Sequence, residues 1–287
     1  MAQSSLPPYA DTGERVWYYA FRVICGAIFL FLIAPILVII PLSFNAEPYF
    51  TFTKEMLAFD PAGYSTRWYE SFLSNDRWMT SIQNSIIVAI FSTILATVLG
   101  TIAALGLSQS HMPYRNFIMG LLISPMVVPL IITAAGIYFF YSTVGLTGSL
   151  FGIILAHTAL GTPFVVITVT ATLIGFDRSL SRAGAMLGAD PTTVFFKIIM
   201  PLILPGVISG ALFAFVTSFD EVVVVLFIAP SPEQYTVPRQ MWSGIREQIS
   251  PTILAVATLL IVLSIVLMTV IELLRRRSER LRGMTPG

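Results

Sequence analysis

The sequence has few charged residues and almost no cysteine or histidine. Only 11% of its 287 residues are charged and 56% are hydrophobic, whereas a soluble domain carries about 25% charged residues. The single cysteine, Cys25, cannot form an internal disulfide, and two histidines far apart in the sequence supply too few ligands for a metal site. A formal net charge of +1 gives no reason to expect a nucleic-acid partner. This composition, with a mean hydropathy of +0.84, indicates an integral membrane protein.

The sequence also lacks the motifs of an enzyme or of a nucleotide-binding protein. It shows no nucleophile–His–acid arrangement, no cluster of metal ligands, and no phosphate-binding loop of the G-x-x-x-x-G-K-[ST] kind. We therefore expect no catalytic residue and no metal in this chain. A secretory cleavage pattern is not evident either, because the first apolar run is too long for a signal peptide. We expect that run to be retained as the first span.

Six segments are long and apolar enough to cross a membrane, since a span needs about 20 mostly apolar residues. They cover residues 16–42, 82–107, 117–141, 150–174, 202–228 and 252–274. Four prolines inside three of the runs, Pro35, Pro125, Pro129 and Pro163, free backbone groups that neighbouring helices must satisfy, which favours a packed bundle. The chain is expected to divide into a tail, first span and outer loop (1–81), a core of five spans (82–275) and a basic tail (276–287).

Lysines and arginines indicate the orientation, because cytoplasmic loops are enriched in them. Placing both termini in the cytoplasm puts eleven of the sixteen on that side, the strongest signal being the ending "RRRSERLR". These eleven are Arg15, Arg22, Arg115, Arg178, Arg182, Lys197, Arg275, Arg276, Arg277, Arg280 and Arg282. The long loops 43–81 and 229–251 then face outward, and the segment 175–206 faces the cytoplasm.

The segment 175–206 carries its own helix start and stop signals. Asp177 can cap the start of a helix, and Gly188 can end that helix in the left-handed conformation. Asp190 followed by Pro191 is typical of the start of a second helix. The first helix would be slim, with one apolar face made of Leu180, Ala183, Gly184 and Leu187. The pattern predicts a helical hairpin that either docks a partner or packs under the membrane.

This hairpin resembles the cytoplasmic coupling loop of the membrane subunits of binding-protein-dependent ABC importers. That family has Glu-Ala-Ala, two further residues, Leu-Gly-Ala, and then an aromatic–aliphatic run ending in proline. The matching positions here are Arg182, Ala183, Gly184, Leu187, Gly188, Ala189, Asp190, Pro191 and Phe195. Because Arg182 and Gly184 replace Glu and Ala, the contact with the ATPase at that end is expected to be rearranged.

The resemblance extends over about residues 82–275. Within the family, three stretches point to one class of permeases. The stretches "SFDEVVVVLFIAP" (218–230), "TVPRQMWSGIREQISPTILAVATLL" (236–260) and "YSTRWYESFL" (64–73) look most like permeases of the spermidine/putrescine class. This implies an all-α type I ABC importer permease fold of six transmembrane helices, with the coupling loop between spans four and five. It also implies a multi-pass subunit of the bacterial inner membrane.

The resemblance further implies partners and a cargo. A homologous second permease would form a heterodimer with this chain, and a periplasmic solute-binding protein would deliver a polyamine. Two ATPase subunits would bind ATP and Mg, so this chain would hold no cofactor itself. 4-Aminobutyrate or another amino acid, an opine, a phosphonate and ferric ion stay open as cargo. A secondary transporter or channel is an alternative of another class, and a membrane enzyme is a further one.

Polar residues within apolar runs are the candidates for a substrate pathway or gate. They are His157, Ser218, Asp220 and Glu221. A charge at bilayer depth costs at least about 2.5–3.5 kcal/mol on insertion scales, so such residues face the bundle interior, a partner or a water path. We expect Asp220 and Glu221 inside the fifth span, in the outer half of the membrane. They either attract a cationic amine or lock helices together, and His157 either senses protons or forms an interhelical hydrogen bond.

Aromatic and charged residues of the outer loops are candidates for contact with the binding protein. They are Trp68, Arg239, Trp242 and Arg246. Tryptophans in such loops also anchor a protein at the membrane interface, so both roles stay open from the sequence.

Overall fold

The computed structural model describes residues 11–109, 111–247 and 250–281, and their regular secondary structure is helical apart from one isolated bridge. Residues 1–10 and 282–287 of the expected tails, including Arg282, lie outside the described residues. The chain forms two compact units. Met1–Ser71 and Ser250–Leu259 make up one, and Phe72–Ile249 and Leu260–Gly287 make up the other. The division expected from the sequence, at residues 81 and 275, stays a prediction.

Four of the six predicted spans are confirmed as single long helices. They are α1 (Thr12–Leu42), α4 (Asp76–Leu107), α7 (Leu150–Ile174) and α13 (Thr252–Leu281). Within the described ranges five helices are long and apolar enough to span a membrane, or six if one bent pair counts as a single span. The other two predicted spans differ from expectation, each because the backbone breaks.

The third predicted span, 117–141, is wrong as a continuous helix. The structure has α5 (Arg115–Val127) and α6 (Leu130–Val144), which meet at 102°. Val128 between them is extended, with φ −70° and ψ 133°. Steric conflict with the ring of Pro129 disfavours the helical conformation at the residue before it, which accounts for the break.

The fifth predicted span, 202–228, also breaks. Helix α10 (Met200–Phe219) ends directly before Asp220, and α11 (Val223–Ile228) begins after an interruption. Asp220 and Glu221 therefore lie between two helices and not inside one, which corrects the sequence-based expectation. The Glu221 side chain bonds to backbone amides of α11, and such local bonds compete with a continuous helix.

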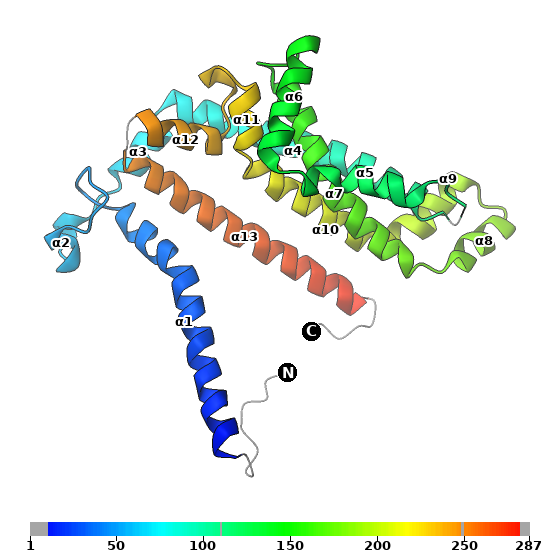
Figure 1. Ribbon diagram of the computed structural model, residues 1–287, viewed down its shortest axis with the longest axis horizontal. Coiled ribbons are helices and arrows are strands. Elements are labelled where there is room, and N and C mark those ends of the chain that lie inside the picture. The colour runs from blue at the N-terminus through cyan, green and yellow to red at the C-terminus, as the bar shows by residue number, and fades with distance from the viewer. Residues whose placement is uncertain (1–10, 110, 248–249, 282–287) are drawn as a thin grey trace. The chain divides into compact units, whose positions relative to one another are not determined.

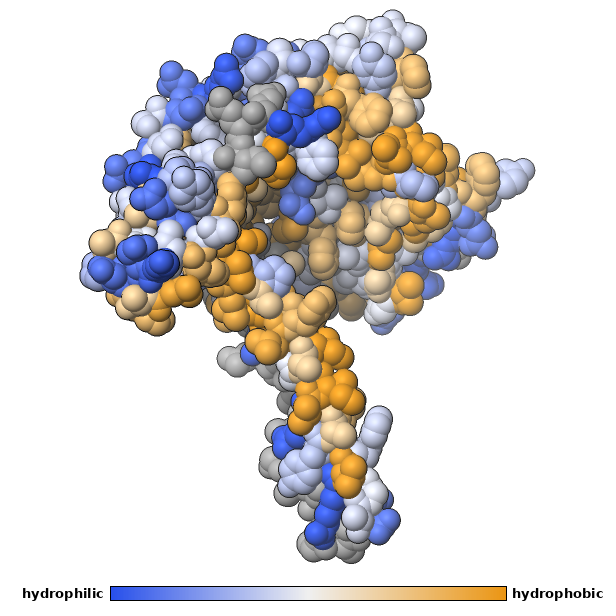
Figure 2. All heavy atoms as spheres, turned by 60° about the vertical axis from the view of Figure 1, so that its left-hand side comes forward, coloured by the Kyte–Doolittle hydropathy of each residue, from blue (hydrophilic) through white to orange (hydrophobic). Residues whose placement is uncertain are grey.

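The first unit contains α1, α2 (Lys54–Leu57), η1 (Pro61–Gly63) and most of α3 (Arg67–Leu73). None of the most apolar 18-residue window of α1 is buried, and Figure 2 shows hydrophobic residues along much of this helix. The loop after α1 is organised by Asn45, whose Nδ2 donates to the carbonyls of Tyr49 (3.0 Å) and Thr51 (2.9 Å). The first unit is thus an ordered polar loop attached to an apolar helix that needs lipid or another protein around it.

Helices α4, α7 and α10 form the core of the second unit and lie side by side (Figure 1). They pack around a buried cluster of Ala96, Ala104, Val165, Val169, Ile203, Val207 and Ala214. Glycines make this approach close: a Cβ on Gly100 would lie 2.6 Å from the Val165 Cβ, and one on Gly210 would lie 2.7 Å from the Val165 Cα. Small residues of this kind let helices pack tightly where the hydrophobic effect gives no drive between them.

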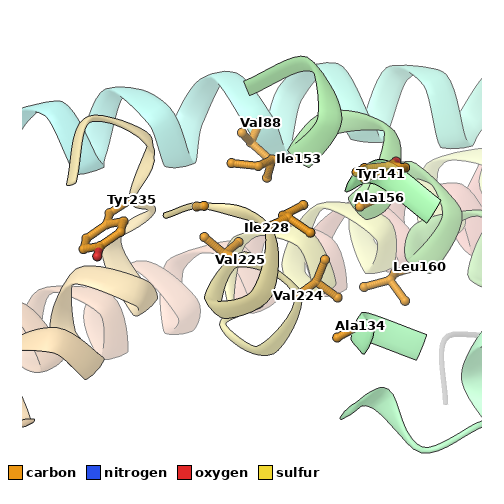
Figure 3. Close-up of a cluster of buried hydrophobic side chains, with 11 residues drawn as sticks. Val88, Ala134, Tyr141, Ile153, Ala156, Leu160, Val224, Val225, Ile228 and Tyr235 are labelled. Carbon is orange, nitrogen blue, oxygen red and sulfur yellow. The ribbon is translucent and has the colours of Figure 1, made fainter. Parts of the chain in front are cut away.

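A second buried cluster holds α11 in place after the break. Figure 3 shows Val224, Val225 and Ile228 of α11 converging with side chains from α4, α6 and α7. The chain beyond α11 is tied back by side chain to backbone bonds. Asn84 Nδ2 donates to the Glu233 and Tyr235 carbonyls at 2.8 and 3.0 Å. The segment leading into α12 (Val237–Glu247) is therefore a fixed part of this unit.

The predicted hairpin is confirmed as α8 (Arg178–Met186), a glycine turn and α9 (Pro191–Val194), followed by η2 (Phe195–Ile199). The Asp177 carboxylate caps α8 by accepting from the Ser179 amide at 2.8 Å, and Gly188 has φ +86°. The predicted apolar face is only partly right. Gly184 packs against Ile198, but Leu187 already lies in the turn and is 89% exposed.

Candidate functional site

A chain of buried polar side chains crosses the second unit at the level where α10 ends. Ser92 of α4 donates to the Ser218 Oγ at 2.9 Å, and the Ser218 Oγ lies 2.8 Å from the His157 Nδ1. The other ring nitrogen, Nε2, lies 3.4 Å from the Glu221 Oε2, an electrostatic contact that is too loose for a hydrogen bond. Both side chains are almost fully buried, at 0% and 2% exposure.

Ser218 is the middle member of this chain. Its Oγ lies within hydrogen-bond distance of both Ser92 and the His157 Nδ1, and the donor in the bond to His157 depends on the imidazole tautomer. The other ring nitrogen, Nε2, faces the Glu221 carboxylate. Two hydrogen bonds link α4, α7 and α10, and the electrostatic contact from His157 extends the chain to Glu221, in the interruption before α11. Of the two roles considered for His157, the interhelical hydrogen bond is present, and its partner is Ser218.

Glu221 is held by backbone groups as well as by His157. Its Oε1 accepts from the Val224 amide at 2.7 Å and its Oε2 accepts from the Val225 amide at 3.3 Å. These two amides are orphan donors at the start of α11, and a carboxylate satisfies both of them. Glu221 is therefore engaged on two sides, by the imidazole and by the first turn of α11.

The adjacent carboxylate, Asp220, is in a different position. It is exposed, and it has no hydrogen-bond or ion-pair partner among residues 11–109, 111–247 and 250–281. It lines a cavity of about 590 Å³ that lies between the α5–α6 bend, α7 and α10. The cavity wall is mainly apolar and includes Phe164, whose ring stacks on Phe213 at 6.1 Å between centroids. The arrangement presents one free carboxylate at the edge of an apolar and aromatic cavity.

The polar chain is not arranged for attack by the Ser218 hydroxyl on a substrate. A serine, a histidine and a glutamate follow one another, but Ser218 is only 5% exposed and its hydroxyl is taken up by Ser92 and His157. A nucleophile must reach its substrate. The described part of the chain also contains no group of three or more His, Cys, Asp or Glu side chains that could hold a metal ion.

Sequence reasoning missed Ser92, which is the member of the polar chain that α4 contributes. One serine in an apolar run gives no signal by itself, because serine hydroxyls in helices often bond to the backbone of the preceding turn. Ser92 makes that bond too, to the Ala89 carbonyl at 3.3 Å. Only the packing of α4 against α10 brings it to Ser218.

Of the four residues predicted to contact a binding protein, two form hydrogen bonds within the chain and two are exposed. Trp68 donates from Nε1 to the Asn45 carbonyl at 2.8 Å. Arg239 lies over the Tyr235 ring, 4.0 Å from its centroid, and donates to its hydroxyl at 2.9 Å. Trp242 and Arg246 of α12 are exposed. Contact with a binding protein stays a prediction for all four, and the two exposed side chains are available for it.

The hairpin presents its tip to solvent. Met186 and Leu187 are 87% and 89% exposed, an unusual amount for large apolar side chains next to a tight turn. Arg182 is exposed one turn earlier.

Hydrogen bonds from the Ser179 side chain and backbone lower the pKa of Asp177, and the charge of Arg182 adds a smaller effect. The cap of α8 is therefore kept by Asp177, although Arg182 stands where glutamate was expected.

Comparison with known proteins agrees with this fold. Residues 96–280 match the family described as "Binding-protein-dependent transport system inner membrane component". The chain is 31% identical over 259 residues to "Spermidine/putrescine transport system permease protein PotC" of Escherichia coli (strain K12), covering 90% of this chain and 94% of that protein. It is 33% identical over 240 residues to "Putrescine transport system permease protein PotI" of the same strain, covering 81% and 82%.

A solved structure shows the same arrangement of helices. A chain of a bacterial ABC transporter involved in the import of the acidic polysaccharide alginate superposes with a TM-score of 0.73. The superposition covers 93% of this chain and 99% of that chain at 16% sequence identity. At this identity the likeness concerns the fold alone, and it confirms the predicted permease fold.

Proposed function

The chain belongs to the family of inner membrane components of binding-protein-dependent transport systems, and we propose that it is the polyamine-conducting permease subunit of an ATP-driven importer. The relatives named for spermidine and putrescine transport cover most of its length. Its cargo would be spermidine, putrescine or a close analogue. The observation that carries the cargo assignment is the free carboxylate of Asp220 at the edge of an apolar cavity.

A polyamine is a chain of methylene groups that ends in ammonium groups. The cavity offers a carboxylate for one ammonium, and apolar and aromatic walls for the methylene chain. Glu221 is not available as a second counter-charge, because its buried carboxylate accepts from the first amides of α11 and faces the His157 imidazole. Asp220 would therefore bind one ammonium, and a second one would be met by another subunit.

The remaining parts of the importer follow from surfaces that this chain leaves uncovered. The apolar circumference of α1 is consistent with lipid and with a homologous second permease in a heterodimer. The exposed Met186 and Leu187 would enter a groove on one of two ATPase subunits, which bind ATP and Mg. A periplasmic solute-binding protein would dock on the opposite side, near Trp242 and Arg246. The excess of Lys and Arg supports cytoplasmic termini.

Uptake kinetics of an Asp220→Asn variant test the cargo assignment. With the carboxylate lost, uptake of spermidine should fall by about tenfold, because an ammonium–carboxylate contact in a partly desolvated site is worth about 1.5–3 kcal/mol. Asp220→Glu is the matched control, since it keeps the charge, and it should retain most of the uptake. Unchanged spermidine kinetics in the Asn variant would contradict the role of Asp220.

The cargo class is tested separately on the cognate binding protein. A thermal-shift screen should include spermidine, putrescine, 4-aminobutyrate, an opine, a phosphonate and ferric ion. We expect the polyamines to stabilise that protein most. Stabilisation by one of the other solutes alone would contradict the polyamine assignment and leave the assignment as an importer subunit in place.

A further inference from the structure

A second cavity, of about 260 Å³, lies at the inner ends of α4 and α7, beside α8. Its position follows from the chain: α4 ends at Leu107 and α7 ends at Ile174, so the cavity lies where the apolar spans give way to polar loops. Its walls include Leu105, Leu173 and Ile199, and its polar side is formed by Arg178, Ser181 and Arg182. The cavity thus has an apolar part and a cationic part.

Among the described residues, neither arginine of the cationic part forms an ion pair within 4.0 Å. The Arg178 guanidinium donates to the Ser108 carbonyl, and this is its one hydrogen bond among the described residues. Arg182 has no hydrogen-bond partner within the described ranges. Asp177 is the nearest carboxylate in sequence: its oxygens accept from the amide and the hydroxyl of Ser179 at 2.8 and 2.7 Å, which lowers its pKa, and the Arg182 charge acts on it at longer range and lowers the pKa further.

An independent observation points to a missing ligand. The Ser181 Oγ, on the cavity wall, is buried and has no hydrogen-bond partner among the described residues. A buried hydroxyl without a partner costs about 1–3 kcal/mol, so native structures satisfy nearly all such groups. A ligand with acceptor oxygens, placed between the two arginines, would satisfy it.

We propose that this cavity binds an anionic phospholipid, with its phosphate held by Arg178, Arg182 and Ser181. Guanidinium groups bind phosphate oxygens by paired, charge-assisted hydrogen bonds. The walls at Leu105, Leu173 and Ile199 would lie along the start of an acyl chain, which a soluble anion does not possess. Anionic lipids are abundant in the cytoplasmic leaflet. The site is defined by this chain's own residues, and only its assignment to that leaflet rests on the proposed function.

Such a lipid would have a structural consequence for the hairpin. The phosphate would be held by three residues of α8, and the acyl chain would lie against Leu105 of α4 and Leu173 of α7, so the lipid as a whole would add to the bond that joins Arg178 to Ser108. The position of α8 would then depend on the lipid composition of the membrane.

Native mass spectrometry of the purified full-length chain tests the proposal. The probes are phosphatidylglycerol, phosphatidylcholine and inorganic phosphate, each added to detergent-solubilised protein. We expect phosphatidylglycerol to remain bound at a stoichiometry near one, and phosphatidylcholine to bind at least about tenfold more weakly, in line with the loss of two charge-assisted bonds. Arg182→Gln should lower the affinity for phosphatidylglycerol by about tenfold. Ser181→Ala, which leaves both arginines in place, should lower it by about threefold.

Arg115→Gln is the matched control, because it removes an exposed arginine at the start of α5 that does not line the cavity. It should bind phosphatidylglycerol like the unchanged protein. Equal retention by the Arg182→Gln and Ser181→Ala variants, or equal loss in the Arg115→Gln variant, would overturn the proposal. Protection against thermal unfolding by inorganic phosphate that equals protection by the lipid would overturn it in favour of a soluble anion. Unchanged lipid retention with lost ATPase co-purification in Arg182→Gln would overturn it in favour of a protein contact.

Discussion

Replacing Glu221 with glutamine perturbs the junction between α10 and α11 with little change of shape. The carboxylate accepts from the Val224 amide at 2.7 Å and from the Val225 amide at 3.3 Å, and it faces the His157 Nε2 at 3.4 Å. Glutamine has one acceptor oxygen, which can keep the shorter bond to Val224. Its NH₂ group would then lie against the Val225 amide and the His157 Nε2, where two or three donors oppose one another.

The cost follows from the bonds that are lost. A hydrogen bond to a charged group contributes about 1.5–3 kcal/mol, and the bond to Val225 is the longer and weaker of the two. Loss of that bond and of the attraction to His157 should lower the free energy of unfolding by about 2 kcal/mol. In a chain of this size that corresponds to a fall in Tm of about 4–8 °C. Uptake should fall as well, because the start of α11 would be held less firmly at the break.

Thermal unfolding in detergent, followed by tryptophan fluorescence, measures this effect. Asp220→Asn is the control, since it removes the same charge one residue earlier from an exposed side chain. Its Tm should stay within about 2 °C of the unchanged protein, as for most surface substitutions, although its polyamine uptake falls. An equal loss of Tm in the two variants, or none in Glu221→Gln, would refute the assignment of Glu221 as the group that stabilises the junction.

Three further predictions concern the hairpin and the helix core. Gly188→Asp and Ala183→Glu should leave membrane insertion intact but uncouple ATP hydrolysis from uptake, as measured by ATPase and uptake assays on the assembled importer. Normal uptake in both variants would contradict the assignment of the hairpin as the coupling element. Gly210→Leu should lower stability by about 1–3 kcal/mol by overpacking, because even a Cβ at that position would lie 2.7 Å from the Val165 Cα, and the Tm in detergent checks this. The lowered pKa of Asp177 means that its cap stabilises α8 above the ordinary carboxyl range and loses this effect as the pH falls through the folded pKa. The protection factors of the amides over 178–186, that is, exchange rates corrected for the intrinsic rate at each pH, should therefore fall on acidification. Asp177→Asn should remove that dependence, and equal loss of protection in the variant would count against the role of Asp177.

The hairpin could be predicted from the sequence because its signals are local. Asp177, Gly188 and Asp190–Pro191 act on their own backbone and on the next two or three residues, and each acts as expected except that the final turn begins at Leu187. Its exposed tip was not predicted. A residue in the turn no longer follows the helical period, so Leu187 leaves the face that the period assigned to it.

The breaks in the third and fifth spans could be predicted less well, for two different reasons. Proline is common in membrane helices, so Pro129 predicts a disturbance but not a bend of 102°. The run 202–228 is apolar almost throughout, and the break there depends on a side chain that bonds to the backbone of the next helix. The polar chain depends on the packing of three helices, which composition and periodicity do not specify.

ATP-driven uptake of radiolabelled spermidine and putrescine into proteoliposomes tests the central claim most directly. The vesicles should contain this chain with its second permease and ATPase subunits, and the binding protein should be supplied on the outer side. We predict uptake that requires ATP and the binding protein, and that falls about tenfold in the Asp220→Asn variant. Uptake of the same polyamines by this chain alone, without ATP, would contradict the account and would indicate a secondary transporter or channel.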